Sequence, residues 1–223
     1  MSRSERDFAP MFFSEHKMAG NPTGVLALQS RAAAHSLSRF PSSARCVKHS
    51  FMYDELKSAI RDVPDFPVKG ILFKDITPIL QDGKLFRMAV DAIADRHKGK
   101  KIDAVVGVDA RGFIFAGAVA YKLGIGLVPV RKKGKLPYKT VVTSYTLEYG
   151  SETSEMHTDS LKKGDNVIIV DDLLATGGTA MAAATLVKQL GASIAEIDFL
   201  IELSFLKGRE RLKEYPVFAA IVY

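Results

Sequence analysis

Asn166-Val-Ile-Ile-Val-Asp171-Asp172-Leu-Leu-Ala175-Thr176-Gly177-Gly178-Thr179 is the stretch on which the interpretation of the whole chain depends. Its apolar run predicts a buried strand over 166–170 that ends at two adjacent carboxylates. A turn of small, hydroxyl-bearing and glycine residues follows, and residues 180–190 have the pattern of a helix. The stretch therefore predicts a strand, a turn and a helix in direct succession.

The residue types of this stretch indicate a ligand that carries both hydroxyls and a phosphate. A turn at a helix N-terminus suits phosphate, because unpaired backbone N–H groups and the positive end of the helix dipole converge there. Carboxylates at the end of a strand suit hydroxyl recognition. Ribose 5-phosphate satisfies both halves, whereas an ordinary strand-to-helix turn would explain the glycines but not the paired acids. We expect Asp171 and Asp172 to engage the ribose hydroxyls, directly or through magnesium. The 5′-phosphate is expected on Ala175, Thr176, Gly177, Gly178 and Thr179.

The same stretch resembles the phosphoribosyl-pyrophosphate signature of the type I phosphoribosyltransferases, in the wording that is typical of the members specific for adenine. The resemblance spans roughly residues 53–223. It implies an enzyme of purine salvage that transfers the phosphoribosyl group from 5-phosphoribosyl 1-pyrophosphate to adenine, giving AMP and pyrophosphate. It also implies Mg²⁺ held mainly by the donor, and a homodimer.

The rest of the chain alternates strands and helices in the way that builds a parallel sheet. We predict strands over 104–108, 126–130, 166–170, 194–201 and 217–222, and helices over 54–63, 85–97, 112–123 and 180–190. Residues 140–147 alternate polar and apolar types, which predicts an exposed antiparallel ribbon. The fold class is therefore α/β, a mainly parallel twisted sheet flanked by helices. The resemblance adds a small N-terminal base-binding hood and makes the ribbon a lid.

Composition limits the classes of function. The chain has 223 residues and a net charge of +6, but residues 1–50 hold seven basic and three acidic residues. Of the 31 basic and 25 acidic residues, 24 and 22 then remain in the globular part, so its charge is nearly balanced and a nucleic-acid partner is not indicated. No apolar stretch has the length of a membrane span. Cys46 is the single cysteine and the five histidines are scattered, so we expect any metal to arrive with the substrate.

Residues 1–50 are rich in Ser and Ala and have no acid between His16 and His49, which predicts a disordered extension ahead of a phosphoribosyltransferase domain over 51–223. Two explanations remain open. The segment is either an organellar transit peptide, since it is acid-poor and rich in Ser and Arg, or a dispensable extension with translation starting at Met52. The enzyme is accordingly expected in the cytoplasm, or in an organelle if the segment directs it there.

A second motif, Asp109-Ala110-Arg111-Gly112, stands where a predicted strand passes into a helix. Taken alone, an ordinary turn with a surface arginine fits it equally well. The resemblance implies that Asp109, Ala110 and Arg111 bind pyrophosphate, with Arg111 as the catalytic cationic anchor. It also implies a cis peptide bond between Asp109 and Ala110.

A third motif places five cations within nine residues, from Arg131-Lys132-Lys133-Gly134-Lys135 to Lys139. A solvated run of charge would explain it. The alternative is a mobile lid that keeps water from the activated ribosyl donor. The resemblance favours the lid and assigns Arg131, Lys132 and Lys135 to the pyrophosphate.

Two further segments are assigned to the base through the resemblance. Glu148 is expected to handle a proton or stabilise charge at the purine, as a catalytic residue. In the predicted hood, Phe73 stacks on adenine and the backbone of Leu72 hydrogen-bonds its edge. Lys74 stands where relatives carry arginine, and lysine lacks the planar donor fork of that residue.

The expected reaction passes through an oxocarbenium-like transition state, with the charge on pyrophosphate met by Mg²⁺, Arg111 and the 131–135 segment. One rival is the same enzyme class acting on another base, such as xanthine or orotate. A second is a regulatory module that senses the donor without turnover. Kinase chemistry is disfavoured because the sequence contains no GxxxxGK[ST] loop.

Overall fold

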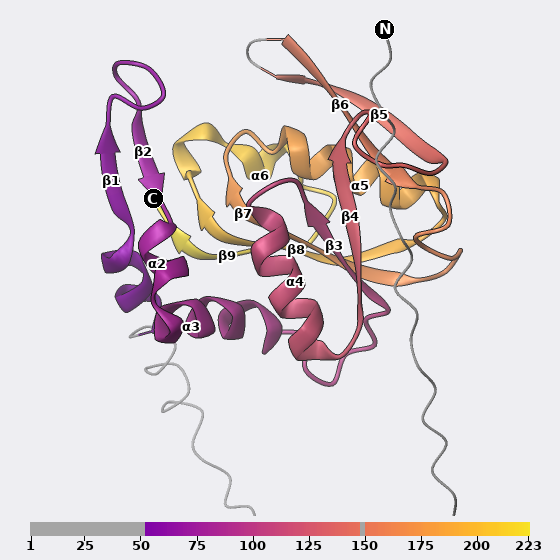
Figure 1. The fold of residues 1–223 in the computed structure, drawn as a ribbon, viewed down its shortest axis with the longest axis horizontal. Helices are drawn as coiled ribbons and strands as arrows, with labels where there is room; N and C mark the ends of the chain where they lie inside the picture. The colour runs from indigo at the N-terminus through magenta and orange to yellow at the C-terminus, as the bar shows by residue number, and fades with distance from the viewer. Residues whose placement is uncertain (1–51, 148–149) are drawn as a thin grey trace, which may run out of the picture. The chain divides into compact units, whose positions relative to one another are not determined.

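The computed structural model describes residues 52–147 and 150–223, and they belong to one compact unit. A seven-stranded sheet runs through it in the order β5-β6-β4-β3-β7-β8-β9 (Figure 1). Five of these strands are parallel to their neighbours in the core of the sheet: β3 (Ala104–Val108), β4 (Gly126–Lys132), β7 (Asn166–Leu174), β8 (Ser193–Glu202) and β9 (Val217–Val222). The predicted α/β class is confirmed.

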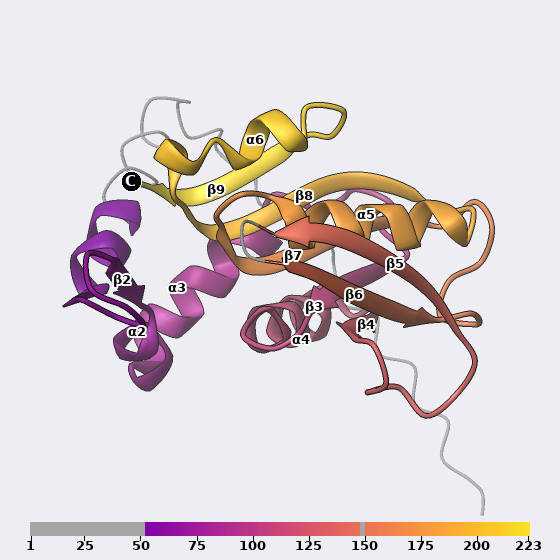
Figure 2. The same cartoon turned by 90° about the horizontal axis from the view of Figure 1, so that it is seen from above.

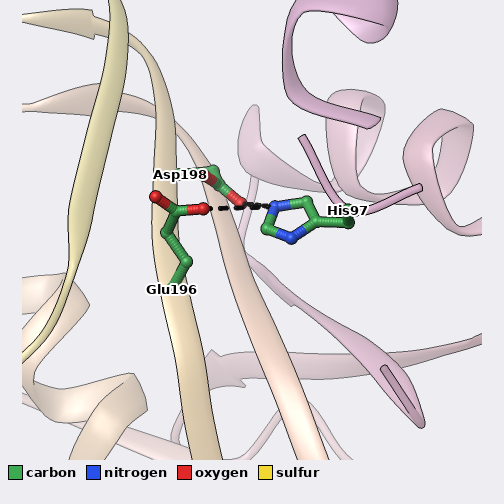
Figure 3. Close-up of side chains that lie close together, drawn as sticks. All are labelled: His97, Glu196 and Asp198. Atoms are coloured by element: carbon green, nitrogen blue, oxygen red, sulfur yellow. Dashed lines mark hydrogen bonds and ion pairs between the residues drawn. The ribbon is translucent and has the colours of Figure 1, made fainter. Parts of the chain in front are cut away.

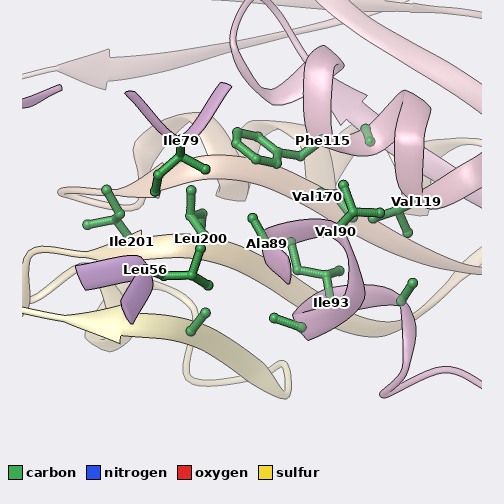
Figure 4. Packing of buried hydrophobic residues seen from close by; sticks show 14 of the residues in the cluster. Leu56, Ile79, Ala89, Val90, Ile93, Phe115, Val119, Val170, Leu200 and Ile201 are labelled. Carbon is green, nitrogen blue, oxygen red and sulfur yellow. The ribbon is translucent and has the colours of Figure 1, made fainter. Parts of the chain in front are cut away.

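The sheet is covered on both faces, as the continuous apolar strands require. All five residues of β3 are buried. One apolar cluster lies under α3 (Gly83–Ala94) and α4 (Gly112–Leu123), and a second lies under α5 (Gly178–Gln189) (Figure 2). In the first cluster Ile93, Phe115 and Leu200 come from two helices and a strand and are fully buried together (Figure 4). Burial of this apolar surface stabilises the position of each helix against the sheet.

Local signals set the helix ends. Asp82 caps α3 by accepting hydrogen bonds from the N–H groups of Lys84 and Leu85, at 2.8 and 2.9 Å. Helix α4 ends at Gly124, whose φ of 70° lies in the left-handed region that glycine adopts without steric cost. The predicted helix over 112–123 is confirmed. The predicted helix over 85–97 is present as α3, which begins and ends earlier.

The N-terminal part of the described chain differs from the prediction. Residues 52–59 are helical, but the helix predicted over 54–63 ends there. Arg61–Pro64 instead forms β1, which pairs antiparallel with β2 (Leu72–Asp75), while Thr77–Gln81 forms α2. The prediction was wrong at this end because the strand 72–75 pairs with the backbone of 61–64 and overrides the helical pattern that reaches Val63. We call residues 61–75 the hairpin below.

The predicted ribbon is confirmed as β5 (Thr140–Leu147), which pairs antiparallel with β6 (Gly150–His157). Strand β6 also pairs with the end of β4, where Arg131 lies opposite Glu155. After β8 come the short helices η1 (Ser204–Leu206) and α6 (Gly208–Arg211). None of the helices within 52–147 and 150–223 combines the length and apolarity that a membrane crossing demands.

The strand containing the quoted signature is longer than predicted. We expected it to end at Val170, yet β7 continues through both aspartates to Leu174 and pairs there with β8. The continuation follows from pairing, since Asp171, Leu173 and Leu174 lie opposite Phe199, Ile201 and Glu202. The two carboxylates therefore stand on a strand instead of a loop. Arg131, expected just beyond a strand, likewise lies inside β4.

Candidate active site

The strand order reverses between β3 and β7, and the candidate site lies there. Successive strands add on one side from β3 to β4, and on the other side from β7 to β8 and β9. Ligands of open α/β sheets bind at such a switch point, beyond the carboxyl ends of the strands. The loop 109–111 after β3 and the turn 175–177 after β7 meet at this edge. Topology alone therefore brings together two motifs that are some sixty residues apart.

Asp171 and Asp172 form a buried acidic pair at this edge. Their relative exposures are 9% and 6%, and the N–H of Asp172 donates to Asp171 Oδ1 at 2.8 Å. Burial, and then the neighbouring charge of Asp172, raise the pKa of Asp171 well above its usual value. Burial also raises the pKa of Asp172, although the Arg111 guanidinium opposes the shift. Burial of two neighbouring carboxylates costs free energy, and hydrogen bonds from hydroxyl groups or contact with a cation would lower that cost.

Gly112 allows the close approach of α4 to this pair. A Cβ atom on Gly112 would lie 2.5 Å from Asp171 Oδ1, and 3.2 Å from the Asp171 Cα atom. The first residue of α4 therefore has no room for a side chain. The resulting contact brings the start of α4 and the acidic pair to one wall of the site.

Arg111 links the acidic pair to the hairpin. Its Nε atom lies 2.7 Å from Asp172 Oδ2, and its guanidinium carbon lies 5.5 Å from the centre of the Phe73 ring. The Asp109–Ala110 peptide bond just before it is cis, as the family resemblance implied. The Arg111 side chain is 44% exposed, so it can meet an anion at this edge. The predicted cationic anchor and the predicted stacking aromatic are therefore neighbours.

The turn after β7 encloses a small hollow of about 60 Å³. It is lined by Asp171 together with the residues predicted for the 5′-phosphate, namely Ala175, Thr176, Gly177, Gly178 and Thr179. Gly177 has a φ of 77° and precedes the first turn of α5, which is 12 residues long. Backbone N–H groups at that helix start offer an anion the donors that the helix leaves unpaired.

Gly208 supports this turn from behind. A Cβ atom on Gly208 would lie 2.2 Å from the Ala175 carbonyl oxygen and 2.7 Å from Leu174 Cδ1. The Leu203 N–H also donates to the Leu174 carbonyl at 2.9 Å. The sequence interpretation missed Gly208 as a functional residue. A Leu-Lys-Gly-Arg stretch has no chemistry of its own, and only the fold places it against the turn.

The cationic segment that begins at the end of β4 is held by acids. Arg131 Nε lies 3.1 Å from Asp109 Oδ2, so Arg131 is fixed beside the 109–111 loop. Lys132 Nζ lies 2.7 Å from Glu152 Oε1. Arg131 and the cis loop thus lie together as predicted, while Lys132 contacts the ribbon. Lys135 is exposed, and its carbonyl accepts a hydrogen bond from Arg131 Nη1 at 3.3 Å.

Glu155, which the sequence interpretation also missed, shapes that segment. Its Oε1 accepts hydrogen bonds from the N–H groups of Lys135 and Leu136, both at 2.8 Å. Burial alone would raise the pKa of Glu155, but these donors and the Gly134 N–H hold it below the usual value. The Thr140 hydroxyl donates to the other oxygen at 3.3 Å. A single buried carboxylate therefore fixes the turn between β4 and β5.

On the hairpin, neighbouring side chains face opposite ways, as strand geometry requires. Phe73 packs edge-on against Phe66 with ring centres 5.1 Å apart, next to Arg111. Lys74 points elsewhere, with Nζ 2.6 Å from Asp62 Oδ1 and 4.0 Å from the centre of the Tyr223 ring. Leu72 pairs with Pro64. The structure therefore brings Phe73 next to Arg111 and directs the Lys74 side chain toward Asp62 and Tyr223 instead, while the contact given for Leu72 lies within the hairpin. Glu148 lies outside the described residues.

A group of potential metal ligands also occurs away from this edge, in residues 52–147 and 150–223. His97, Glu196 and Asp198 are buried, with ligand atoms within 4.8 Å of one another (Figure 3). His97 Nε2 lies 2.7 Å from Asp198 Oδ2, while Arg96 Nη2 lies 2.5 Å from Glu196 Oε1. The two carboxylates therefore have cationic or hydrogen-bonding neighbours within the protein. We interpret the group as a network that joins the end of α3 to β8.

Comparisons with known proteins agree with this geometry. Residues 77–218 match the phosphoribosyl transferase domain family. The adenine phosphoribosyltransferase of Roseiflexus sp. (strain RS-1) is 52% identical over 172 residues, covering 77% of this chain and 100% of the relative. That of Syntrophotalea carbinolica is 58% identical over 170 residues, covering 76% and 99%.

Solved structures give the same result. The adenine phosphoribosyltransferase of Thermoanaerobacter pseudethanolicus superposes with a TM-score of 0.75 at 49% identity, covering 77% of this chain and 99% of that one. The Saccharomyces cerevisiae enzyme, solved with adenine and an imino-altritol bisphosphate, gives a TM-score of 0.73 at 45% identity, with coverage of 77% and 99%.

Proposed function

Because the chain belongs to the adenine phosphoribosyltransferases of the phosphoribosyl transferase domain family, we propose that it transfers the phosphoribosyl group from 5-phosphoribosyl 1-pyrophosphate to adenine in purine salvage. The products are AMP and pyrophosphate. One observation carries the proposal beyond membership: the acidic pair, the hollow at the start of α5 and Arg111 stand at a single edge of the sheet. That edge matches a sugar with a vicinal diol, a 5′-phosphate and an anionic leaving group.

Donor binding is assigned to the β7–α5 turn. The 5′-phosphate accepts hydrogen bonds from the N–H groups at the start of α5, with the hydroxyls of Thr176 and Thr179 beside it. The ribose hydroxyls donate to Asp171 and Asp172. Those donated hydrogen bonds offset the desolvation that raises both carboxyl pKa values, so the bound sugar relieves a cost already present in the fold.

The acidic pair also fits Mg²⁺, which prefers carboxylate and phosphate oxygens. Two adjacent buried carboxylates with raised pKa values are a site where a divalent cation compensates repulsion. We therefore propose Asp171 and Asp172 as the protein groups beside a Mg²⁺ that the donor brings. When bound, the ion neutralises part of the pyrophosphate charge.

Departure of pyrophosphate is assigned to the cations at the same edge. Arg111, held by Asp172, and Arg131, held by Asp109, are positioned before substrate arrives. Donors placed in advance stabilise charge that develops in the transition state. Lys132 and Lys135 join them from the segment that leads into the ribbon, which we propose as the lid that excludes water.

Adenine is assigned to the hairpin, at the Phe73 ring that lies beside Arg111. Phe73 offers a flat face for stacking, and its ring is already oriented by Phe66. In the hairpin, Leu72 lies opposite Pro64, which has no N–H to donate to the Leu72 carbonyl. That carbonyl suits the exocyclic amino group of adenine. Glu148 remains our proposal for charge stabilisation at the purine.

A base panel tests the proposal. Purified full-length protein, Mg²⁺ and phosphoribosyl pyrophosphate are mixed in turn with adenine, hypoxanthine, guanine, xanthine or orotate, and nucleotide formation is followed by chromatography. We expect AMP from adenine and little product from the others. If nucleotide formed with one of the other bases and not with adenine, the protein would catalyse a different phosphoribosyl transfer. Donor binding with no product from any base would instead identify a sensing module.

Further proposals concern the whole chain. We propose a homodimer in the cytoplasm, with the phosphoribosyltransferase domain over 51–223 and residues 1–50 as an extension. Exposed apolar side chains on α4 and β4 support an interface there, since Ile114 and Leu127 are each 42% exposed and Tyr121 is 90% exposed. Light scattering during size-exclusion chromatography measures the oligomeric state, and fusion of residues 1–50 to a fluorescent protein tests targeting.

A further inference from the structure

The hairpin has no strand pairing to the central sheet. Strands β1 and β2 form a separate two-stranded sheet, whereas the seven other strands of the described residues are continuous. An isolated two-stranded hairpin is marginally stable in water. Its position relative to Arg111 must therefore come from side-chain contacts with the rest of the fold.

Lys74 makes such a contact on the face of β2 opposite Phe73. Its side chain is only 12% exposed, and its ammonium group lies 4.0 Å from the centre of the Tyr223 ring. Asp62, across the hairpin on β1, pairs with the same ammonium group at 2.6 Å. The ammonium group thus joins both strands of the hairpin to one aromatic ring.

Tyr223 is a fixed platform for that contact. Its N–H donates to the Glu202 carbonyl at 2.9 Å, and its carbonyl accepts from the Ser204 N–H at 2.9 Å and from the Ser204 hydroxyl at 2.5 Å. Burial raises the pKa of the Tyr223 phenol, in keeping with a ring packed against the fold. Figure 1 shows this end of the chain beside β2.

A second cation reaches the same ring from the helical residues 52–59. Lys57 Nζ lies 4.7 Å from the ring centre and donates to the Val222 carbonyl at 2.9 Å. The Tyr223 hydroxyl donates to the Lys57 carbonyl at 3.5 Å. Tyr223 therefore contacts two cations, one from the helical residues 52–59 and one from the hairpin.

We propose that the Lys74–Tyr223 contact positions the hairpin for adenine, which makes both side chains positioning residues that act through Phe73. Because Phe73 and Lys74 are adjacent on one strand, a shift of Lys74 off the ring rotates β2 and moves Phe73 from Arg111. The inference rests on the proposed function and deepens it. Lysine and arginine at position 74 would each present a cation to the aromatic face, so this contact needs no planar fork toward the base.

Steady-state kinetics on four variants tests the idea. Tyr223→Leu and Lys74→Met remove the ring and the cation, and we expect each to raise the KM for adenine by about five- to thirtyfold, the factor that a cation–π contact supports. The KM for phosphoribosyl pyrophosphate should stay within about twofold, since the β7–α5 turn is untouched. Tyr223→Phe and Lys74→Arg keep ring and cation, and both should keep a nearly normal adenine KM.

The double variant Lys74→Met with Tyr223→Leu should raise the adenine KM by less than the product of the two single-variant factors, because the two changes share the loss of one contact. Equal rises in the two KM values would show a general loss of structure and overturn the proposal. Failure of Lys74→Arg to preserve the adenine KM would overturn it as well.

Hydrogen exchange separates this inference from the proposed function. In Tyr223→Leu, the amides of 61–75 should exchange faster than in the wild-type protein, while those of β7 and α5 keep their protection. This readout needs no turnover. An unchanged exchange rate in the hairpin would defeat the positioning role even in an active enzyme. Faster exchange of the hairpin amides in Tyr223→Leu, combined with no adenine turnover by the wild-type protein, would support the Lys74–Tyr223 contact and refute only the proposed enzyme activity.

Discussion

Replacing Gly208 with alanine should damage the phosphate-binding turn from behind, although Gly208 touches no substrate in our assignment. The new Cβ atom would lie 2.2 Å from the Ala175 carbonyl oxygen, where ordinary contact begins at 3.4 Å. The two backbones must therefore separate by about 1.2 Å, less whatever bond-angle adjustment absorbs. Leu174 Cδ1, at 2.7 Å, can turn aside, but the carbonyl belongs to the turn itself.

A displacement of that size has consequences for both catalysis and stability. A misplacement of about 1 Å in a positioning element can lower the rate about a hundredfold. We expect kcat/KM for the donor to fall by about ten- to a hundredfold, mostly through the donor KM. Overpacking of this kind typically lowers the free energy of unfolding by about 1–3 kcal/mol. Adenine binding to the hairpin should change little.

The assay is donor-dependent AMP formation, with urea denaturation measured in parallel. Gly83→Ala is the matched control, because a Cβ atom on Gly83 meets nothing within 4 Å and its φ is not in the left-handed region. The control should keep normal kinetics and gain up to about 1 kcal/mol through a less flexible unfolded chain. A Gly208→Ala protein with wild-type donor KM and stability would refute the reasoning, since the turn would then tolerate the separation.

Three further changes test the electrostatics of the site. Asp171→Asn should abolish donor binding yet raise the free energy of unfolding at pH 7, because a buried charge is removed. Because burial raises the pKa of the Asp171 carboxyl, the native protein binds this proton more tightly than the unfolded chain does. The free energy of unfolding of the wild type therefore falls as the pH rises through the native pKa. Denaturation measured from pH 4 to 8 should show this fall in the wild type and a smaller fall in the variant. Glu155→Gln should raise the donor KM by about three- to tenfold, as charge-assisted hydrogen bonds to the 134–136 turn weaken, and an unchanged KM would remove Glu155 from the site. Arg111→Lys keeps the charge but cannot hold Asp172 and an anion with one planar fork, so kcat should fall by at least tenfold; full activity would show that charge alone suffices.

Elements with a physical marker at each end could be predicted from the sequence. Helix 112–123 starts at Gly112 and ends at Gly124, and both bounds are confirmed. The strands over 104–108, 140–147 and 217–222 also agree with their predicted bounds, since polar or turn-forming residues interrupt the pattern where pairing stops. The periodicity of apolar residues and the positions of residues that end helices and strands are local properties, so they can be read from the sequence.

Elements whose limits depend on a distant partner could not be predicted. The helical stripe of apolar positions predicted over 54–63 reaches Val63, yet residues 61–64 pair with 72–75. Strand β7 passes through Asp171 and Asp172 only because β8 lies alongside. From residue type alone, Asp171 and Asp172 would be expected on the surface. Their pKa values are raised because the extension of the strand buries them.

The same distinction applies to the site. Residues that carry the chemistry, such as Arg111 and Asp171, are visible in the sequence because charged groups interrupt apolar strands. Residues that hold them in place are not, since Glu155 and Gly208 act through contacts with backbone that no spacing reveals. Lys74 shows the limit most clearly. Side chains on a strand alternate between faces, so one step along β2 separates a ring beside Arg111 from an ammonium group on Tyr223. The sequence motif suggests both Phe73 and Lys74 as adenine-binding residues, but only the strand pairing in the hairpin determines which of the two side chains faces the base.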